Sequence, residues 1–306
     1  MSGHFTDATV RVRVPATSAN LGPGFDALGL ALALHDDVAA RVTASGLEVE
    51  VSGEGADGVS RDETHLVVRA MRRAFTAMGV ECPGLALTCD NRIPHGRGLG
   101  SSAAAIVGGL LLARGLVRDG VSRLPDGEIL ELACELEGHP DNVAPCLLGG
   151  LTIAWMEGAT ALAVRRDLDP AIVPVALIPP FTASTELARG LLPATVPHAD
   201  AAFAAGRAAL LVAALTGTPQ ALLAATEDRL HQSYRAPAMP DSAQLVAELR
   251  SRGHAAVISG AGPTVLVLAR GQVEAESAMS AAPQDWTSMV LVVDAPGAHV
   301  LADTSL

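Results

Sequence analysis

A glycine- and serine-rich segment in the first half of the chain has the composition of a phosphate-binding loop. Its residues are Pro94, His95, Gly96, Arg97, Gly98, Leu99, Gly100, Ser101, Ser102, Ala103 and Ala104. Glycine lets the backbone approach a ligand closely, and the free N–H groups at the start of a helix favour an anion. The segment is therefore predicted to hold a polyphosphate through backbone N–H groups, with a serine hydroxyl free to ligate Mg²⁺. On composition alone, an ordinary glycine turn with a serine cap is an equally good interpretation.

The basic side chains of the chain narrow the possible chemistry. All 21 lysine-or-arginine positions among the 306 residues are arginine. A Walker-A loop, a protein-kinase site and a Schiff-base enzyme each need a lysine, so these classes are excluded. Cationic contacts must come from guanidinium groups, which stay protonated and bind carboxylates or phosphates in a bidentate manner.

Composition also restricts the partners. Hydrophobic residues make up 49% and charged residues 18%, which supplies a large core. A net charge of -12 and only 3% aromatic residues argue against a nucleic-acid partner. The cysteines have no C-x-x-C spacing and are expected to be free thiols in a reducing cytoplasm; they are Cys82, Cys89, Cys134 and Cys146. The longest uncharged run, between Arg207 and Glu227, is interpreted as a buried helix pair, so no membrane partner is expected.

The elements that must position the loop follow from hydrophobic periodicity and turn residues. In the first half, strands are expected at 8–14, within 38–51, at 85–89 and after Gly149-Gly150. Helices are expected from Thr64 to Met78, from a cap at Ser101 or Ser102, and at 126–137. In the second half, strands are expected at 172–178 and at 288–293, and a strand–turn–strand unit is expected within 255–269. Helices are expected there at 184–191, 198–216, 219–226, 242–252 and 271–280. This pattern predicts two α+β domains, 1–158 and 159–306.

Three motifs in order along the chain resemble those of a known superfamily. The segment at 94–104, with the pattern P-x-x-x-G-L-G-S-S-A-A, resembles the central motif of the GHMP small-molecule kinases. VISGAGPTVLVL at 257–268 is similar to their C-terminal hairpin, and VRVPATSANLGPGFDALGLAL at 12–32 resembles the signature of the homoserine kinase branch. The resemblance implies ATP and Mg²⁺ as cofactors. It also implies an N-terminal domain like domain 2 of ribosomal protein S5 and a ferredoxin-like C-terminal domain.

The same resemblance implies a substrate and the residues that hold it. Homoserine kinases phosphorylate the side-chain hydroxyl of L-homoserine on the route to threonine. That substrate is a zwitterion, so its site needs an anion for the ammonium and an arginine for the carboxylate. By the motifs, Asp26 would hold the ammonium, and Arg189 and Arg235 would clamp the carboxylate. The other substrate-binding positions implied are Asn20, Asn142, Thr185, Gly260 and Gly262. Taken alone, Asn20 and Asp26 are more typical of turn residues whose side chains fix the local backbone than of a binding site.

The resemblance further implies the metal ligands and the groups at the reacting phosphate. Glu131 would ligate Mg²⁺ together with Ser102, in preference to Ser101. His139, Asp141 and Asn142 would lie near the transferring phosphoryl group. Many relatives have an aspartate base where this chain has Asn142, so direct attack by the substrate hydroxyl is expected. The alternative is that Asp141 or His139 takes the proton.

Two other functions are compatible with parts of this pattern. Another kinase of the superfamily, acting on shikimate, mevalonate or a sugar, would have no use for the charges that match a zwitterion. A non-catalytic sensor would bind ligand and nucleotide without turnover. A homodimer is expected from the resemblance alone, and the cysteine pattern favours the cytoplasm.

Overall fold

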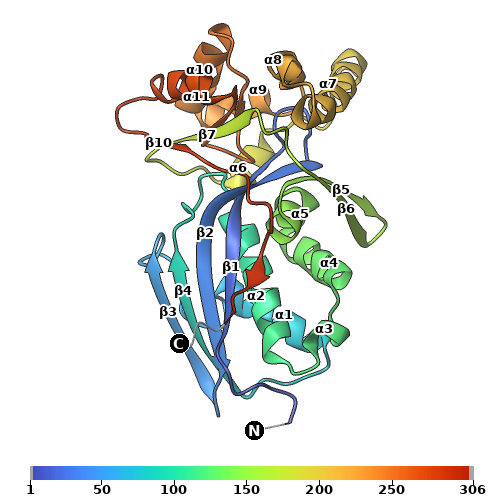
Figure 1. The fold of residues 1–306 in the computed structure, drawn as a ribbon, viewed down its shortest axis with the longest axis vertical. Helices are drawn as coiled ribbons and strands as arrows, with labels where there is room; N and C mark the ends of the chain where they lie inside the picture. Colours follow the sequence, from blue (N-terminus) through green and yellow to red (C-terminus); the bar gives the residue numbers. More distant parts are fainter. Residues whose placement is uncertain (1–2, 303–306) are drawn as a thin grey trace.

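The computed structural model describes residues 3–302 as two sheet-and-helix units joined end to end (Figure 1). The lower unit holds the first half of the chain and its last strand, and the upper unit holds most of the second half. Each unit mixes strands and helices around its own sheet, as the α+β prediction requires.

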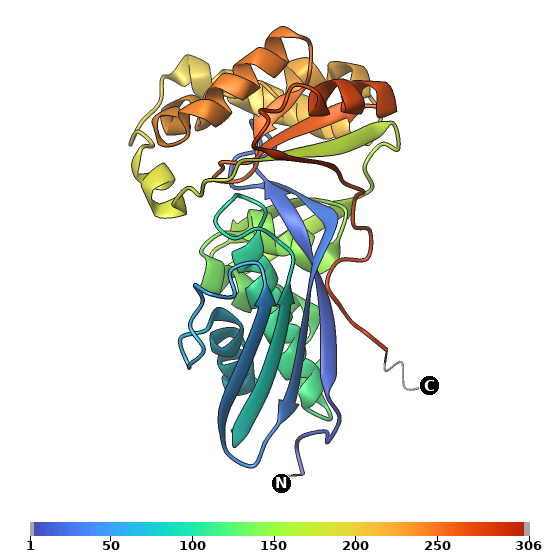
Figure 2. The same cartoon turned by 90° about the vertical axis from the view of Figure 1, so that its left-hand side faces the viewer.

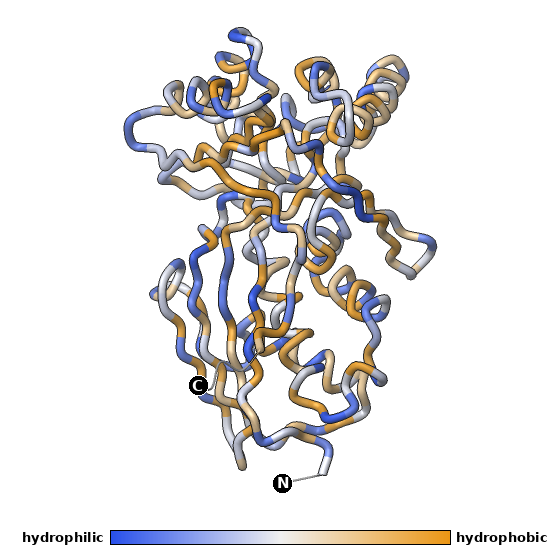
Figure 3. The backbone as a smooth tube through the Cα atoms, in the orientation of Figure 1, coloured by the Kyte–Doolittle hydropathy of each residue, from blue (hydrophilic) through white to orange (hydrophobic). Residues whose placement is uncertain are grey.

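The lower sheet has seven strands and is antiparallel except for one parallel pair, β3 with β4. Its path is β11-β1-β2-β4-β3, and β5 and β6 extend from β2. The strands are β1 (Val10–Ala19), β2 (Leu28–Val42), β3 (Gly46–Gly53), β4 (Gly84–Asn91), β5 (Leu151–Glu157), β6 (Thr160–Arg166) and β11 (His299–Val300). Hydrophilic and hydrophobic residues alternate repeatedly along these strands (Figure 3). This alternation is expected for a sheet with one face packed on a core.

Helices cover one face of this sheet (Figure 2). They are α1 (Leu66–Ala77), α2 (Ser101–Leu116), α3 (Gly120–Arg123), α4 (Asp126–Glu137) and α5 (Pro140–Leu148). Helix α2 is apolar on nearly all sides and lies at the centre of the core, where Ile106, Leu110 and Leu112 are almost fully buried. A helix buried on all sides needs no polar face. Its first turn is consequently fixed firmly against the sheet.

The upper sheet has four strands in the order β10-β7-β9-β8. These are β7 (Ile172–Ile178), β8 (Ala256–Ile258), β9 (Val265–Arg270) and β10 (Thr287–Val290). The helices of this unit are α6 (Thr185–Gly190), α7 (His198–Thr216), α8 (Leu222–Ala225), α9 (Gln232–Arg235), α10 (Pro240–Ser251) and α11 (Gln272–Met279). A separate hydrophobic cluster that includes Val175, Leu177 and Val267 lies under β7 and β9.

Two helix starts differ from the sequence prediction. Thr64 does not cap α1: its N–H and hydroxyl both donate to Asp62 Oδ1, and the helix begins at Leu66. Neither loop serine caps α2, because Gly100 occupies the cap position in the left-handed conformation, with φ of 74°. Glycine reaches that conformation without the steric cost that serine would incur. The hydroxyl groups of both serines are therefore not used by a helix cap.

The uncharged run around α7 is only partly buried, so the prediction of a buried helix pair is wrong for most of it. Of the α7 residues, only Ala204, Leu211, Ala214 and Leu215 are buried. Among the described residues 3–302, α7 is the one helix whose length and hydropathy would allow it to cross a membrane, a test that core helices of water-soluble proteins also pass.

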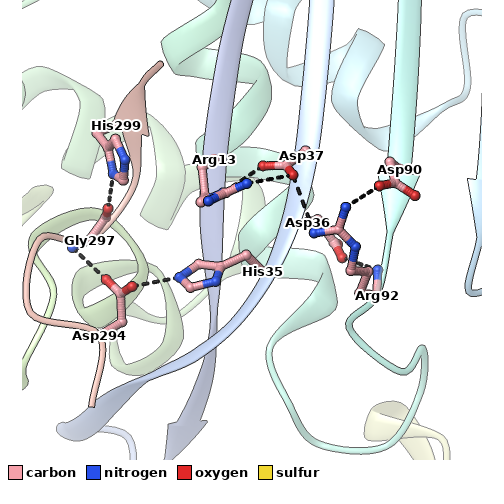
Figure 4. Close-up of polar contacts among 9 residues, drawn as sticks. All are labelled: Arg13, His35, Asp36, Asp37, Asp90, Arg92, Asp294, Gly297 and His299. Atoms are coloured by element: carbon pink, nitrogen blue, oxygen red, sulfur yellow. Dashed lines mark hydrogen bonds and ion pairs between the residues drawn. The ribbon is translucent and has the colours of Figure 1, made fainter. Parts of the chain in front are cut away.

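The lower sheet includes two segments that lie at or beyond the predicted domain limit. Strands β5 and β6 pair with each other, and the predicted domain limit at 158 and 159 lies in the turn between them. The C-terminal segment leaves the upper unit and runs back along the lower one to pair β11 with β1 (Figures 1 and 2). It is fixed there by Asp294, whose Oδ2 lies 2.6 Å from His35 Nε2 and whose Oδ1 accepts the Gly297 N–H at 2.7 Å (Figure 4).

Candidate active site

A polar cavity of about 170 Å³ lies where the two units meet. Segments that are far apart in the sequence contribute to its wall, and most of the predicted site residues are among them. The predicted residues at this wall are Asn20, Asp26, Gly96, Gly98, Gly100, Ser101, Ser102, His139, Asp141, Asn142, Thr185, Arg189, Arg235, Gly260 and Gly262. Glu137 and Ala261 also line it and were not predicted.

The loop before α2 needs its glycines for two reasons. Gly96, Gly98 and Gly100 all have φ between 64° and 74°, a region that favours glycine. A Cβ on Gly98 would lie 2.2 Å from the Ser259 carbonyl oxygen, so no larger residue fits against the upper unit. The loop is thereby held between α2 and the turn that joins β8 to β9, and its backbone faces the cavity.

Other loop residues point away from this cavity. Leu99 and Ala103 are buried in the core, and the Arg97 side chain bonds to backbone carbonyl groups. His95 and Ala104 line a second cavity of about 320 Å³. The two cavities share Ser101 and Ser102 in their walls and therefore meet at the start of α2.

The second cavity is mostly apolar and lies on the side of the loop toward β2 and α1. Val38, Leu66 and Cys89 form part of its wall. The buried His65 also faces it, and no hydrogen-bond partner for His65 Nδ1 occurs within residues 3–302. Burial lowers the pKa of His65, so its imidazole is neutral at physiological pH. A polar cavity thus adjoins an apolar cavity that contains a neutral hydrogen-bonding group.

Glu137, and not Glu131, is the carboxylate beside the loop serine. Ser102 Oγ donates to Glu137 Oε2 at 2.6 Å, whereas Glu131 does not line the cavity. The two glutamates are six positions apart on α4, which at about 3.6 residues per turn directs them to different sides of the helix. Burial raises the pKa of Glu137, and the Ser102 hydrogen bond opposes that rise.

Three polar residues follow where α4 leads into α5: His139 is the N-cap of α5, and Asp141 and Asn142 lie in its first turn. His139 Nδ1 lies 2.6 Å from Asp141 Oδ1, and this hydrogen bond raises the pKa of His139. Asp141 is almost fully buried, with 1% of its surface exposed. Asn142 Oδ1 accepts the Thr17 hydroxyl at 2.9 Å, which fixes the orientation of its amide. The cavity therefore contains a histidine–aspartate pair and an oriented amide next to the phosphate-type loop.

The N-terminal turn presents one carboxylate and supports it with an amide. Asn20 and Asp26 both have left-handed backbone conformations, with φ of 69° and 54°. Asn20 Oδ1 accepts the Asp26 N–H at 2.9 Å, and its Nδ2 donates to the Gly260 carbonyl at 2.9 Å. Asn20 thus has the turn-fixing role that its residue type allows, and it also lies at the cavity wall. Asp26 Oδ1 and Oδ2 both accept from the Arg189 guanidinium.

Two arginines approach from the upper unit. Arg189 forms an ion pair with Asp26, in which Arg189 Nη2 lies 2.8 Å from Asp26 Oδ1. Arg189 lies on α6, four residues after Thr185. Arg235 is 2% exposed, and its pKa is lowered by burial and by Arg189. Its Nη1 reaches the Gly260 carbonyl at 3.3 Å, but its buried Nε has no partner among the described residues. A buried cation with an unsatisfied donor at a cavity wall is suited to bind an anion.

Sequence reasoning missed Glu137 and Thr17. Glu137 directly precedes the G-H-P-D-N turn, and that proximity is the signal that favours it over the three glutamates earlier in the helix. Thr17 lies within a strand, and no local pattern indicates that it meets Asn142, which is 125 residues away.

Comparisons with known proteins agree with this arrangement. Family models of the GHMP kinase N-terminal domain and the GHMP kinase C-terminal domain match residues 65–150 and 201–287. The chain is 58% identical to a homoserine kinase of Streptomyces avermitilis, over 97% of each chain. It is 54% identical to one of Clavibacter michiganensis, over 96% of this chain and 95% of the relative. The crystal structure of homoserine kinase from Cytophaga hutchinsonii superposes with a TM-score of 0.82 and 26% identity, over 97% and 98% of the two chains. The chain belongs to the homoserine kinase family of the GHMP kinases.

Proposed function

We propose that this enzyme transfers the γ-phosphoryl group of ATP to the side-chain hydroxyl of L-homoserine, forming O-phospho-L-homoserine and ADP. The observation that carries the proposal is the charge pattern of the polar cavity. A carboxylate, Asp26, and two guanidinium groups, Arg189 and Arg235, face the same space as the glycine loop. This set matches an amino-acid zwitterion that lies beside a polyphosphate.

The two adjoining cavities support the placement of the nucleotide. The phosphates would bind the backbone N–H groups of the loop and of the first turn of α2, where the helix dipole also favours negative charge. The base would enter the apolar cavity beside β2 and α1, within reach of His65 Nδ1. No lysine is needed, because the loop supplies its donors from the backbone.

Ser102 and Glu137 are the residues that fit a magnesium ion. Mg²⁺ prefers oxygen ligands and usually keeps one or two protein carboxylates together with water and phosphate oxygens. A hydroxyl and a carboxylate held 2.6 Å apart beside the phosphate loop provide such a set. When bound, the ion neutralises charge on the phosphate oxygens.

Binding of the substrate would replace the ion pair between Asp26 and Arg189 with two ion pairs between the substrate and the protein. In the structure Asp26 and Arg189 neutralise each other, each with a little over a third of its side chain exposed. L-homoserine would place its ammonium on Asp26 and its carboxylate between Arg189 and Arg235. Thr185 lies one helical turn from Arg189 and can contact the same carboxylate. The side-chain hydroxyl would then extend toward the loop.

In the transfer step, the protein would act mainly by positioning the substrate hydroxyl and the phosphoryl group. The Asn142 amide has little basicity, and its oxygen already accepts the Thr17 hydroxyl, so it orients groups without taking a proton. A loose phosphoryl-transfer transition state requires alignment and charge compensation more than a strong base. His139 is the alternative proton acceptor, since Nδ1 faces Asp141 and Nε2 is left for the substrate.

The reaction is tested by ADP release with L-homoserine, L-threonine, shikimate and mevalonate, each offered separately. We expect turnover with L-homoserine at a kcat/KM far above that for the others. Preference for shikimate or mevalonate would assign another kinase activity, and nucleotide binding without any turnover would indicate a sensor. The His139→Gln and Asp141→Asn variants separate the two mechanisms. A kcat loss of about 10²–10⁴-fold in either, with unchanged substrate affinity, would identify a general base.

We also propose that the enzyme acts as a homodimer in the cytoplasm. Its membership in a family of metabolic kinases and its unpaired thiols support the location. Sedimentation at several protein concentrations tests the dimer, and a single species of about 31 kDa would contradict it.

A further inference from the structure

Arg97 lies in the glycine loop, but its side chain does not line the polar cavity. The guanidinium group donates three hydrogen bonds to backbone carbonyl oxygens instead. Nε reaches Pro179 at 3.0 Å, Nη2 reaches Pro180 at 2.8 Å, and Nη1 reaches His95 within the loop at 3.1 Å. The planar fork of arginine suits two adjacent carbonyl groups, and lysine has no such geometry. Arg97 thus joins the phosphate loop to a segment of the upper unit.

The segment that accepts these bonds leads directly to the substrate-binding helix. Strand β7 ends at Ile178, and α6 begins at Thr185. Between them, Pro179 and Pro180 have restricted φ angles and no N–H groups, so this part of the chain is stiff and cannot pair as a strand through its own donors. Its carbonyl groups need donors from elsewhere, and Arg97 supplies them.

A backbone hydrogen bond next to Arg97 connects the same two segments. The Ala183 N–H donates to the Gly96 carbonyl at 3.1 Å, two residues before α6. The Thr182 side chain also lies close to Gly96, at 3.4 Å from the position of a Cβ there. The approach to α6 is therefore fixed to Gly96 and Arg97, two residues of the glycine loop.

We propose that Arg97 is a positioning residue that couples nucleotide binding to substrate binding. A nucleotide that orders the loop would fix the Arg97 fork, and the fork would hold the Pro179-Pro180 segment. That segment would place Thr185 and Arg189 for the substrate. The inference rests on the proposed function only in assigning phosphates to the loop and the substrate to α6.

The first test measures hydrogen–deuterium exchange in peptides that cover residues 179–192. A non-hydrolysable ATP analogue with Mg²⁺ should slow exchange there in the wild-type enzyme and should not do so in Arg97→Ala. Arg69→Ala is the matched control, because Arg69 is an exposed arginine on α1 that makes no side-chain hydrogen bond with the described residues, and it should behave as wild type. Equal slowing in Arg97→Ala and wild type, or none in wild type, would overturn the proposal.

The second test measures the dissociation constant of L-homoserine with and without the analogue. Couplings between sites are commonly about 5-fold or more, so the analogue should tighten wild-type binding by at least that factor. The ratio of the dissociation constants without and with the analogue should fall toward one in Arg97→Ala. It should take an intermediate value in Arg97→Lys, which keeps the positive charge but not the planar guanidinium group. An undiminished factor in both variants would contradict the proposal. If the Arg97→Ala variant does not fold, the comparison of Arg97→Lys with wild type is sufficient for this test.

The two tests fail in distinguishable ways. If the enzyme does not turn over L-homoserine, the proposed function is wrong, yet the exchange experiment still shows whether the loop controls α6. If L-homoserine is turned over but exchange at 179–192 ignores the nucleotide, the function stands and the coupling through Arg97 is wrong.

Discussion

The Ser102 hydroxyl donates to the Glu137 carboxylate at 2.6 Å and thereby joins the first turn of α2 to the last turn of α4. This contact places a negative group directly beside the glycine loop. Burial raises the pKa of Glu137, so an ionised Glu137 costs stability unless a cation is near. This cost is consistent with the magnesium-binding role proposed for Glu137.

Replacing Glu137 with glutamine should strongly reduce catalysis. The amide keeps the size and the Ser102 contact but loses the charge that would hold Mg²⁺ in the proposed site. We expect kcat to fall by about 10²–10³-fold, the range found when one transition-state electrostatic contact is removed. Steady-state assays over a range of Mg²⁺ concentrations measure the effect.

The matched control is Glu131→Gln on the same helix, which should retain wild-type kcat. A large loss in Glu131→Gln together with a small loss in Glu137→Gln would reassign the metal ligand to the earlier position. Thermal unfolding without Mg²⁺ gives an independent readout. Because the folded-state pKa of Glu137 is raised, its stabilising effect is present at acidic pH and is lost as pH rises through that pKa. Glu137→Gln should therefore be at least as stable as wild type at neutral pH.

The His139–Asp141 pair predicts a pH-dependent contribution to stability. Its hydrogen bond raises the pKa of His139, so the stabilisation is fully present below the ordinary histidine pKa of about 6.5. It is lost as pH rises through the higher folded-state value. Asp141→Asn should lower the His139 pKa, as measured by NMR titration of its imidazole. It should also lower the free energy of unfolding more at pH 6 than at pH 9. An unchanged midpoint in the variant would show that Asp141 does not set the protonation of His139.

The sequence predicts local elements well and long-range contacts poorly. The limits of β7 and α7 agree with the prediction at both ends, since hydrophobic periodicity and turn residues act over a few positions. The return of β11 to β1 joins residues almost 290 positions apart, and nothing local encodes it.

The candidate site shows the same division. Motifs bring the correct turn and helix to the cavity, which is why His139 and Arg189 lie where they were expected. Motif spacing does not determine which side of α4 faces the loop, and this is why the motif points to Glu131 although Glu137 lies beside Ser102. The αL conformation of Gly100 likewise depends on the contact of the loop with Thr17, where a Cβ would collide with the hydroxyl.

Asp26 should determine the preference for an amino group in the substrate. Asp26→Asn removes the charge for the substrate ammonium, and hydrogen bonds to charged groups contribute about 1.5–3 kcal/mol. We therefore expect kcat/KM for L-homoserine to fall by roughly 10- to 100-fold. With 4-hydroxybutanoate, which lacks the amino group, the variant should lose much less activity. An equal loss with both compounds would mean that Asp26 acts only by orienting Arg189.

The C-terminal segment should contribute to stability through one buried carboxylate. Asp294 is 5% exposed and binds both His35 and the Gly297 N–H (Figure 4). Asp294→Ala leaves the buried Gly297 N–H and the partly buried His35 Nε2 without their acceptor, so the free energy of unfolding in urea should fall by about 1–3 kcal/mol. His299→Gln is the control on the same segment, because the one hydrogen bond of the His299 ring among the described residues is to the Gly297 carbonyl; its effect should stay within about 0.5 kcal/mol. Asp294→Asn keeps an acceptor for Gly297 and should lie between the two. Equal destabilisation by the Asp294→Ala and His299→Gln variants would show that the backbone pairing of β11, rather than the carboxylate, holds the segment.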